Sequence, residues 1–217
     1  SHGLLLRCLA GFEMINDLDL GDDTLLWTPA EWGPLTLLNF VYPALYYGRP
    51  MVADSGDYAD RRQLVTALVK YGITNALLPG QAFRLLVEHE YEPETHRMKL
   101  RTAFTVAEPI DAHTADCLNA LGVSVNSGYL GPDGNIVAAS CARWFSPRPG
   151  SVGRTVPGNV IQIVDEAGRT LPPGREGRIV VGRADESADT HEPGNGDCRL
   201  TEDYGVIDSE GYLRIRR

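Results

Sequence analysis

Apolar residues recur at helical spacing in several segments of the first two thirds of the chain. The clearest segment begins after Asp60, a residue type that caps helix N-termini, and ends at Gly72, a residue type common just after helix C-termini. The apolar positions between them follow an i, i+3, i+4, i+7 pattern: Leu64, Ala67, Leu68 and Tyr71. This spacing predicts an amphipathic helix with one buried face.

Short apolar runs alternate with such helical segments. Further helices are expected over Leu4–Phe12, Leu35–Tyr47, Gln81–His89 and Asp111–Leu121, and strands over Thr24–Trp27, Met51–Ala53, Ile73–Leu78, Ala103–Val106 and Val123–Val125. Strands separated by helices of this length need crossover connections, which make the strands parallel and place the helices on the faces of the sheet. The pattern predicts an α/β layer built on a mostly parallel sheet with flanking helices.

The pattern changes near Phe145. Beyond it, short alternating runs follow one another with turn residues and no helices between them: Val160–Val164, Gly177–Gly182 and Tyr212–Ile215. We therefore expect an α/β subdomain over residues 1–144 and a smaller all-β subdomain over residues 145–217. Residues 183–199 are rich in Asp, Glu, Gly and Pro and almost without apolar side chains, which predicts a mobile loop.

Charge and composition exclude several classes of protein. The 217 residues include 20 Lys and Arg against 29 Asp and Glu, a net charge of −9, whereas a nucleic-acid binder needs a basic face. No apolar run approaches the roughly 20 residues of a membrane helix. The four cysteines and five histidines are scattered without metal or disulfide spacing. We expect a cytoplasmic protein without a signal peptide, whose start at Ser1 looks cut, and neither a nucleic-acid partner nor a membrane span.

Four residue strings in the second half come in a fixed order. They are Pro149–Gly158 (PGSVGRTVPG), Ile163–Gly168 (IVDEAG), Leu171–Val181 (LPPGREGRIVV) and Thr201–Tyr212 (TEDYGVIDSEGY). Together they resemble the adenylate-forming superfamily of acyl-CoA synthetases. The family pattern runs PGSVG(K/R)P-PG, then IVDE-G, PPG-EGEIVV and TGD-G-D-DGY.

The α/β part agrees with one branch of that superfamily. Trp27–Trp32 (WTPAEW) and Pro43–Pro50 (PALYYGRP) look like strings of the acetyl-CoA and medium-chain acyl-CoA synthetases. The resemblance spans essentially the whole chain but only the middle of such an enzyme. The family's phosphate loop would precede Ser1, and its hinge and C-terminal domain, with the catalytic Lys, would follow Arg217. We therefore expect a segment of a longer polypeptide that does not catalyse alone.

The resemblance implies a two-step reaction. In the family, a carboxylate attacks the α-phosphate of ATP and releases pyrophosphate, and the acyl group then passes from AMP to the thiol of coenzyme A. The implied cofactors are ATP or AMP, magnesium and coenzyme A, and the substrate is a small carboxylic acid. Such phosphoryl chemistry depends on positioning and on the neutralisation of developing charge.

The resemblance also implies a nucleotide site. Asp203 matches the aspartate that accepts hydrogen bonds from the ribose hydroxyls, a task suited to an acceptor-only carboxylate. Ser127, Gly128 and Tyr129 lie in the string that holds adenine, with Tyr129 as its aromatic face. We expect Tyr129 and Asp203 to flank one cleft shaped for adenosine. The alternatives are a turn Asp at position 203 and a plain surface turn near residues 126–135.

Three further residues of the implied nucleotide site have local alternatives. Asp133 replaces the magnesium-binding Glu of the family and is one methylene shorter. Glu108 and Pro109 match a loop that runs beside adenine. The same pair also fits the N-terminal turn of the helix that follows, so the sequence leaves both interpretations open.

The acyl pocket of the resembling branch corresponds to Trp27, Glu31 and Trp32. A buried tryptophan serves equally well as simple core, so this assignment stays open beside a structural one.

Four departures from the family pattern fall on positions that should face a ligand. They are Pro34, Val106, Pro132 and Glu202, which replace an aromatic residue, a Gly, a Thr and a Gly. Pro132 has neither a hydroxyl nor a backbone N–H to offer a phosphate. The alternative to a ligase is therefore a catalytically degenerate relative that acts as a nucleotide-binding or scaffold module.

Overall fold

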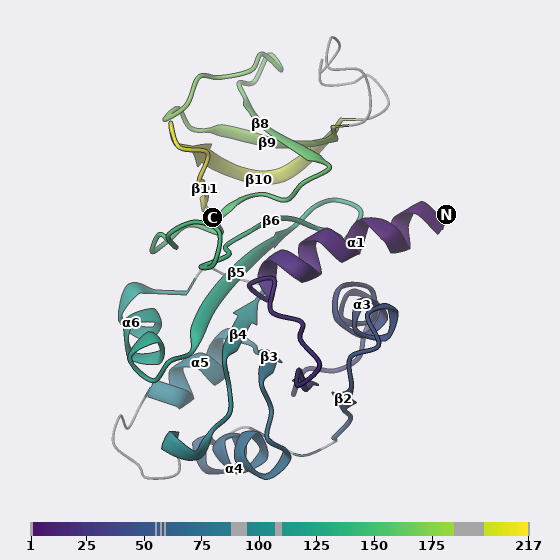
Figure 1. Ribbon diagram of the computed structural model, residues 1–217. Coiled ribbons are helices and arrows are strands. Elements are labelled where there is room, and N and C mark those ends of the chain that lie inside the picture. The colour runs from purple at the N-terminus through teal and green to yellow at the C-terminus, as the bar shows by residue number, and fades with distance from the viewer. Residues whose placement is uncertain are drawn as a thin grey trace.

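The computed structural model describes residues 2–54, 56, 58, 60–87, 95–106, 110–184 and 198–216 (Figure 1). The predicted mobile loop falls almost wholly on residues outside these ranges, so it stays a prediction. Among the described residues, no helix combines the length and apolar character needed to cross a membrane.

A seven-stranded sheet forms the larger layer of the molecule. Its strands are β1 (Leu26–Trp27), β2 (Met51–Val52), β3 (Asn75–Leu77), β4 (Thr102–Thr105), β5 (Ser124–Leu130), β6 (Ile136–Ala139) and β7 (Arg154–Thr155). They are ordered β2-β1-β3-β4-β5-β6-β7. The strands from β2 to β5 are parallel, whereas β6 and β7 continue the sheet antiparallel. The predicted α/β fold with a mostly parallel sheet is confirmed.

Helices cover both faces of this sheet. They are α1 (His2–Ile15), α2 (Pro34–Thr36), the π-helical turn η1 (Leu37–Val41), α3 (Tyr42–Tyr46), α4 (Arg61–Tyr71), α5 (Gly80–Val87), the 3₁₀ turn η2 (Thr95–Arg97) and α6 (Ala112–Ala120). The apolar side chains of α4, α5 and α6 join one buried cluster, and those of α1, η1 and α3 join another.

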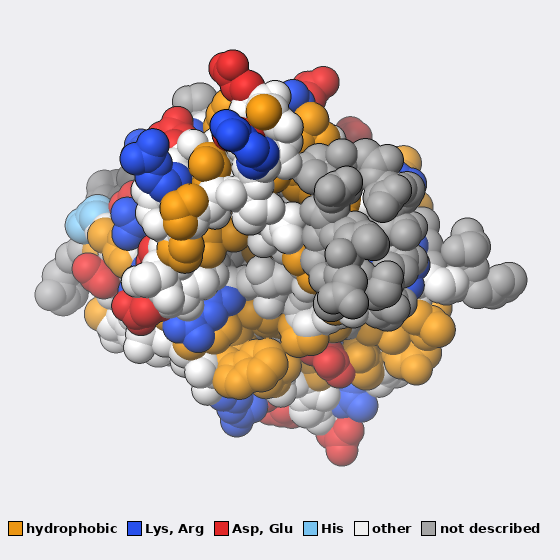
Figure 2. Space-filling model, turned by 90° about the horizontal axis from the view of Figure 1, so that it is seen from above, with side chains coloured by type: hydrophobic (Ala, Val, Ile, Leu, Met, Phe, Trp, Pro, Cys, Tyr) orange, Lys and Arg blue, Asp and Glu red, His pale blue; other side chains and the backbone are white. Residues whose placement is uncertain are grey.

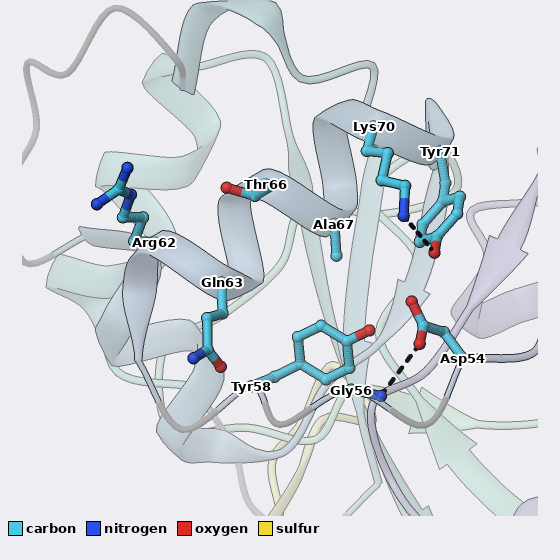
Figure 3. A pocket seen from close by; sticks show the side chains of 9 residues that line it. All are labelled: Asp54, Gly56, Tyr58, Arg62, Gln63, Thr66, Ala67, Lys70 and Tyr71. Carbon is cyan, nitrogen blue, oxygen red and sulfur yellow. Dashed lines mark hydrogen bonds between the residues drawn. The ribbon is translucent and has the colours of Figure 1, made fainter.

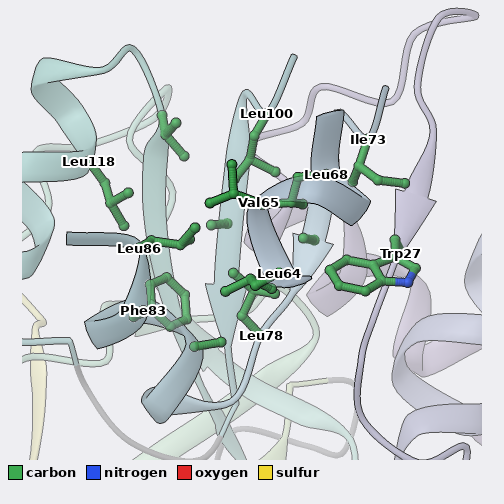
Figure 4. Close-up of a cluster of buried hydrophobic side chains, with 14 of the residues drawn as sticks. Trp27, Leu64, Val65, Leu68, Ile73, Leu78, Phe83, Leu86, Leu100 and Leu118 are labelled. Atoms are coloured by element: carbon green, nitrogen blue, oxygen red, sulfur yellow. The ribbon is translucent and has the colours of Figure 1, made fainter. Parts of the chain in front are cut away.

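Alternation along the strands assigns neighbouring residues to these two clusters. Trp27, Ala76 and Ala103 belong to the cluster under α4, α5 and α6, and the residues next to them, Leu26, Leu77 and Phe104, belong to the cluster under α1 and η1. Figure 4 shows the first cluster, to which Leu64 and Leu68 of α4 and Phe83 of α5 belong. The sheet is therefore buried on both faces, as expected for a mostly parallel sheet with helices on its faces.

Helix α4 has the predicted end groups. The Asp60 side chain accepts a hydrogen bond from the Gln63 N–H at 2.9 Å, which satisfies one of the free donors of the first turn. Gly72 has a φ of 67°, the left-handed conformation that glycine adopts without strain.

The predicted helix over Leu35–Tyr47 is helical but not regular. It comprises α2, η1 and α3 in succession, with π-type hydrogen bonding at Leu37–Val41. Pro43 has no N–H to continue the i→i−4 ladder, and it lies in the first turn after the π segment. A local departure from α-helical bonding of this kind is frequent at functional sites.

A second sheet follows the first, as predicted. Its strands are β8 (Asn159–Val164), β9 (Gly177–Arg183), β10 (Arg199–Ile207) and β11 (Leu213–Arg216), ordered β11-β10-β9-β8 and all antiparallel. β7 lies beyond residue 145 in sequence yet pairs with β6 of the first sheet. The division into units of 1–144 and 145–217 stays a prediction.

The two sheets pack against each other through one buried cluster. Tyr129 and Val137 contribute from β5 and β6, and Ile161, Ile179 and Leu213 contribute from the second sheet. The segment around Gly153 connects the two sheets. The Gly153 C=O accepts a hydrogen bond from the Leu213 N–H of β11 at 2.8 Å. This interface determines where β10 lies relative to β5.

Two glycines of the PGSVGR string differ in their surroundings. Gly153 has a φ of 96°, and a Cβ atom there would overlap the backbone of Ala139 in β6. Gly150 has a similar φ of 73°, but a Cβ atom there would meet no other atom within 4 Å.

We predict that Gly153→Ala destabilises the chain far more than Gly150→Ala. Both substitutions place a side chain at positive φ, which costs about 1–2 kcal/mol. Gly153→Ala also forces two backbone segments apart, which raises the total to about 3 kcal/mol or more. Urea unfolding of both variants measures the difference, and equal losses would contradict the close approach of Gly153 to β6.

Candidate functional site

Tyr129 and Asp203 meet where the two sheets join. The Tyr129 hydroxyl donates a hydrogen bond to Asp203 Oδ2 at 2.8 Å, although the residues lie 74 positions apart in sequence. Burial raises the pKa of Tyr129 to about 12, so the phenol keeps its proton at neutral pH and is the donor. The predicted proximity of these two side chains is therefore observed.

The position of Asp203 is set by an irregularity in strand β10. The pairing of β10 with β9 shifts register between Leu200 and Tyr204, so Asp203 lies in a bulge. Thr201 holds this bulge, because its hydroxyl accepts from the Asp203 N–H at 3.2 Å and donates to the Ile179 C=O at 2.9 Å. Bulges commonly re-aim a side chain next to functional sites.

Tyr129 and Asp203 differ in their accessibility. The Tyr129 side chain packs into the cluster between the sheets, and the residue is only 6% exposed. Asp203 is half-buried and uses Oδ2 for Tyr129. A carboxylate has about four lone-pair sites, so Asp203 retains acceptor capacity for additional donors such as a pair of hydroxyls.

The turn between β5 and β6 carries Asp133. Asp133 Oδ1 accepts from the Asn135 N–H at 3.1 Å, and Oδ2 accepts from the Asn135 amide at 2.9 Å. The Arg7 guanidinium of α1 lies 4.0 Å from Oδ2, and a third of the Asp133 side chain, 33%, is exposed. The described residues contain no preformed group of three or more metal-ligating side chains.

The single carboxylate of Asp133 is compatible with the way in which enzymes that use nucleotides usually bind magnesium. Magnesium keeps several waters and is commonly held by one or two carboxylates together with substrate phosphates rather than by an all-protein cage. Asp133 supplies one partly exposed carboxylate, so it fits a metal that arrives with its nucleotide.

Ser127 and Gly128 are built into the sheet. Ser127 Oγ accepts from the Ile110 N–H at 3.3 Å, and the Ser127 N–H donates to Ser140 Oγ at 2.7 Å. A Cβ atom on Gly128 would come within 2.8 Å of Ile15 Cδ1. Both residues are buried and support the position of β5. Glu108 and Pro109 lie outside the described residues, so their predicted place beside adenine stays a prediction.

The three residues predicted to line the acyl pocket do not lie in one environment. Trp27 is fully buried in the cluster under α4 (Figure 4), and its ring lies edge-on to the ring of Tyr58, with the two centroids 4.9 Å apart. Glu31 is exposed, and Trp32 is 41% exposed just before α2. Only the latter two are available to a ligand in this conformation.

The departures from the family pattern are mostly at the surface. Pro34, Pro132 and Glu202 are exposed, and Val106 is half-buried. None of the three exposed residues contributes to the buried clusters of the fold.

Asn39, which none of the sequence motifs includes, is bonded to the turn that carries Asp133. It is 4% exposed on η1, and its amide bonds the β5–β6 turn: Nδ2 donates to the Gly134 C=O at 2.6 Å, and Oδ1 accepts from the Ile136 N–H at 3.2 Å. The available signal was an amide inside an otherwise apolar helical segment. Buried polar groups require partners, so such a residue indicates a contact with another segment.

A surface hollow of about 420 Å³ lies elsewhere, along α4 (Figure 3). Tyr58, Lys70 and Tyr71 line it together with Asp54. Hydrogen bonds from the Tyr71 and Tyr58 hydroxyls hold the pKa of Asp54 below its usual value. The carboxylate is thus already bonded within the protein, and the hollow is remote from Tyr129 and Asp203.

Charged side chains are mixed on the face that the second sheet presents. In Figure 2, Lys and Arg side chains and Asp and Glu side chains are both scattered over the described part of this face, with apolar side chains between them. No broad basic patch of the kind that binds a phosphate backbone is visible there.

Similar proteins are acyl-CoA synthetases. Mitochondrial acyl-coenzyme A synthetase ACSM4 of Homo sapiens is 25% identical over 210 residues, which is 90% of this chain and 36% of that protein. Mitochondrial ACSM5 of Mus musculus is 25% identical over 207 residues, which is 89% of this chain and 36% of that protein. The chain thus spans little more than a third of these relatives. Their names place them in mitochondria, and the cytoplasmic location expected here stays a prediction.

Solved structures share the fold. VinN superposes with a TM-score of 0.81 and 22% identity, over 100% of this chain and 56% of that chain. O-succinylbenzoate coenzyme A synthetase (MenE) of Bacillus subtilis in complex with AMP superposes with a TM-score of 0.78 and 17% identity, over 99% of this chain and 45% of that chain.

A family model, that of the AMP-binding enzymes, matches residues 1–185, which is most of the chain. The sheets, the ordered strings and the structural likeness agree with this match. The chain belongs to the AMP-binding enzyme family.

Proposed function

We propose that this chain is the nucleotide- and acid-binding part of an AMP-forming acid–CoA ligase. In the first step, a carboxylate oxygen bonds to the α-phosphorus of ATP, the bond to the bridging oxygen breaks, and pyrophosphate leaves. In the second, the thiol of coenzyme A loses its proton as its sulfur bonds to the acyl carbon, the bond from that carbon to the phosphate oxygen breaks, and AMP leaves. The family match and the acyl-CoA synthetase relatives support this reaction class.

The observation that carries the proposal is the Tyr129–Asp203 contact. A hydrogen bond of 2.8 Å between the sheets brings the implied ribose aspartate to the strand that carries the implied adenine string. In the proposed complex, Asp203 accepts hydrogen bonds from the ribose hydroxyls through its remaining lone pairs. The phenol of Tyr129 orients that carboxylate, and Glu108, Pro109, Ser127 and Gly128 form the neighbouring wall.

Asp133 is the proposed protein ligand of magnesium. A bound magnesium ion neutralises phosphate charge while pyrophosphate leaves. The partly exposed carboxylate of Asp133, on a turn next to β5, is available for this contact. Glu31 and Trp32, which are exposed before α2, are the accessible candidates for the acid side, whereas Trp27 lies in the core a few residues before them.

The reaction also needs parts that we assign to a longer polypeptide. The phosphate loop and the C-terminal domain with its catalytic Lys are the proposed partners of these 217 residues, which bind ligands but do not catalyse alone. Coenzyme A binds in the complete protein. Within the chain, residues 1–144 are the proposed acyl- and adenine-binding unit, and residues 145–217 contribute Asp203.

The alternative is a relative that keeps the fold as a nucleotide-binding or scaffold module. The observation that favours it is the location of three departures, Pro34, Pro132 and Glu202, at the surface, where they affect ligands rather than packing. The two proposals differ in catalysis but not in fold, so binding and turnover must be tested separately.

We predict that the chain binds AMP and that Asp203→Asn weakens this binding about 10-fold or more, since hydrogen bonds to a charged group contribute roughly 1.5–3 kcal/mol. The amide still accepts from Tyr129 but lacks the charge and the second acceptor oxygen. Isothermal titration calorimetry measures the change.

Asp165→Asn is the matched control for the calorimetry. Asp165 is a turn aspartate elsewhere in the second sheet whose carboxylate accepts backbone hydrogen bonds from Ala167 and Arg169, and no ligand contact is proposed for it. Equal AMP affinity of the wild-type chain and Asp203→Asn would refute the ribose role. An absence of AMP binding by the wild-type chain would make Tyr129 and Asp203 purely structural.

For the full-length protein we predict carboxylate-dependent exchange of radiolabelled pyrophosphate into ATP. A panel of short to medium carboxylic acids tests the first step directly, because exchange requires reversible formation of the acyl-adenylate. Reactions without acid, and the 217-residue chain alone, should show none. A folded full-length protein that exchanges with no acid would favour the scaffold module.

A further inference from the structure

Asn39 joins the helical segment before β2 to the turn that carries Asp133. Its amide makes three hydrogen bonds: Nδ2 donates to the C=O groups of Gly134 (2.6 Å) and Leu35 (3.1 Å), and Oδ1 accepts from the Ile136 N–H (3.2 Å). The bonds to Gly134 and Ile136 span 95 and 97 positions of sequence. An amide that uses both its donor and its acceptor on one turn restrains the direction of that turn as well as its distance.

The surroundings of Asn39 make these bonds strong determinants of position. The residue is 4% exposed, so water does not readily replace its partners. Breaking the contact would leave the buried Ile136 N–H without its acceptor, a more costly state than the same loss at the surface. Asn39 lies on the π-helical turn η1, which departs from the bonding of a regular helix.

The β5–β6 turn also makes close apolar contacts with the α2–η1 segment. Gly134 has a φ of 81°, and a Cβ atom there would lie 2.9 Å from Leu35 Cδ2 and 3.8 Å from Leu38 Cδ2. Gly134 therefore lies directly against the α2–η1 segment. From the other side, Arg7 of α1 approaches the Asp133 carboxylate to 4.0 Å.

We propose that Asn39 is a positioning residue: through its bonds to Gly134 and Ile136, it holds Asp133 where that carboxylate meets a magnesium nucleotide. The inference rests on the proposed function, because it requires Asp133 to be a magnesium ligand. Asn39 itself touches neither metal nor nucleotide. Its effect is expected on metal–nucleotide affinity and not on the binding of metal-free AMP at Asp203.

The test compares two buried asparagines in the full-length protein. Asn39→Leu removes all three bonds and keeps the number and branching of the side-chain heavy atoms, although two methyl groups occupy more space than the amide. Asn16→Leu is the control, because Asn16 is also fully buried and its amide donates to the Phe12 C=O at 2.9 Å and accepts from Asn75 at 3.0 Å, away from the turn. Both variants should lower the melting temperature, so stability alone does not distinguish them.

Mn²⁺–ATP affinity, measured by water-proton relaxation, is the first readout. We expect Asn39→Leu to weaken it about as much as Asp133→Asn, and the double variant to be no weaker than either single variant, as for residues that act through one contact. Asn16→Leu should bind Mn²⁺–ATP like the wild type. Metal-free AMP should bind the wild type and the four variants within about two-fold of one another.

Hydrogen exchange at the β5–β6 turn is the second readout and needs no ligand. The Ile136 amide should exchange roughly 2- to 12-fold faster in Asn39→Leu, the range set by the net contribution of one hydrogen bond. It should be unchanged in Asn16→Leu. If Asn39→Leu fails to fold, Gly134→Ala displaces the same turn from the other partner, since its Cβ would collide with Leu35.

The outcomes separate the inference from the function on which it rests. If Asp133→Asn binds Mn²⁺–ATP as tightly as the wild type, the magnesium role of Asp133 fails and the inference fails with it. If Asp133→Asn is weakened but Asn39→Leu matches Asn16→Leu, only the positioning role of Asn39 is wrong. If Asn39→Leu loses as much affinity for metal-free AMP as it loses for Mn²⁺–ATP, the effect is a general structural one and the proposal is overturned.

Discussion

Packing between the two sheets is the constraint on which the candidate site depends. Asp203 and Tyr129 belong to different sheets, and their 2.8 Å hydrogen bond exists only because the apolar cluster between the sheets holds β10 against β5. Hydrogen bonds are directional and short-ranged, so a small slip of one sheet would separate the pair. The buried phenol of Tyr129 is bonded to the half-buried carboxylate of Asp203, which lies at the edge of the apolar interface.

The residues that build the two sheets and the interface between them differ in kind from those that would meet a ligand. Gly153 and Gly177 lie so close to neighbouring backbone that a Cβ atom at either position would overlap it. Both fall in strings that match the family, whereas Pro132 and Glu202 are exposed departures. Packing requirements therefore explain the matched strings without reference to activity, which is why family membership and catalysis are separate questions for this chain.

Much of the fold could be predicted because its signals are local. Asp60 and Gly72 end α4 through a side-chain cap and a positive φ, both of which depend on neighbours in sequence. Hydrophobic spacing placed the helices, and the alternation of helices and strands implied the parallel sheet. The irregular helix at Leu37–Val41 was not predictable in the same way, because its apolar pattern is equally consistent with a regular α-helix.

The sequence by itself determined the order of elements, the change to antiparallel strands and the family strings that point to Asp203 and Tyr129. Only the tertiary structure decided that these two side chains bond each other, that Trp27 lies in the core, and that Asn39 holds the turn of Asp133. The physical reason is sequence separation. Periodicity and caps act over a few residues, whereas these contacts join segments far apart in sequence whose meeting depends on the packing of complete layers.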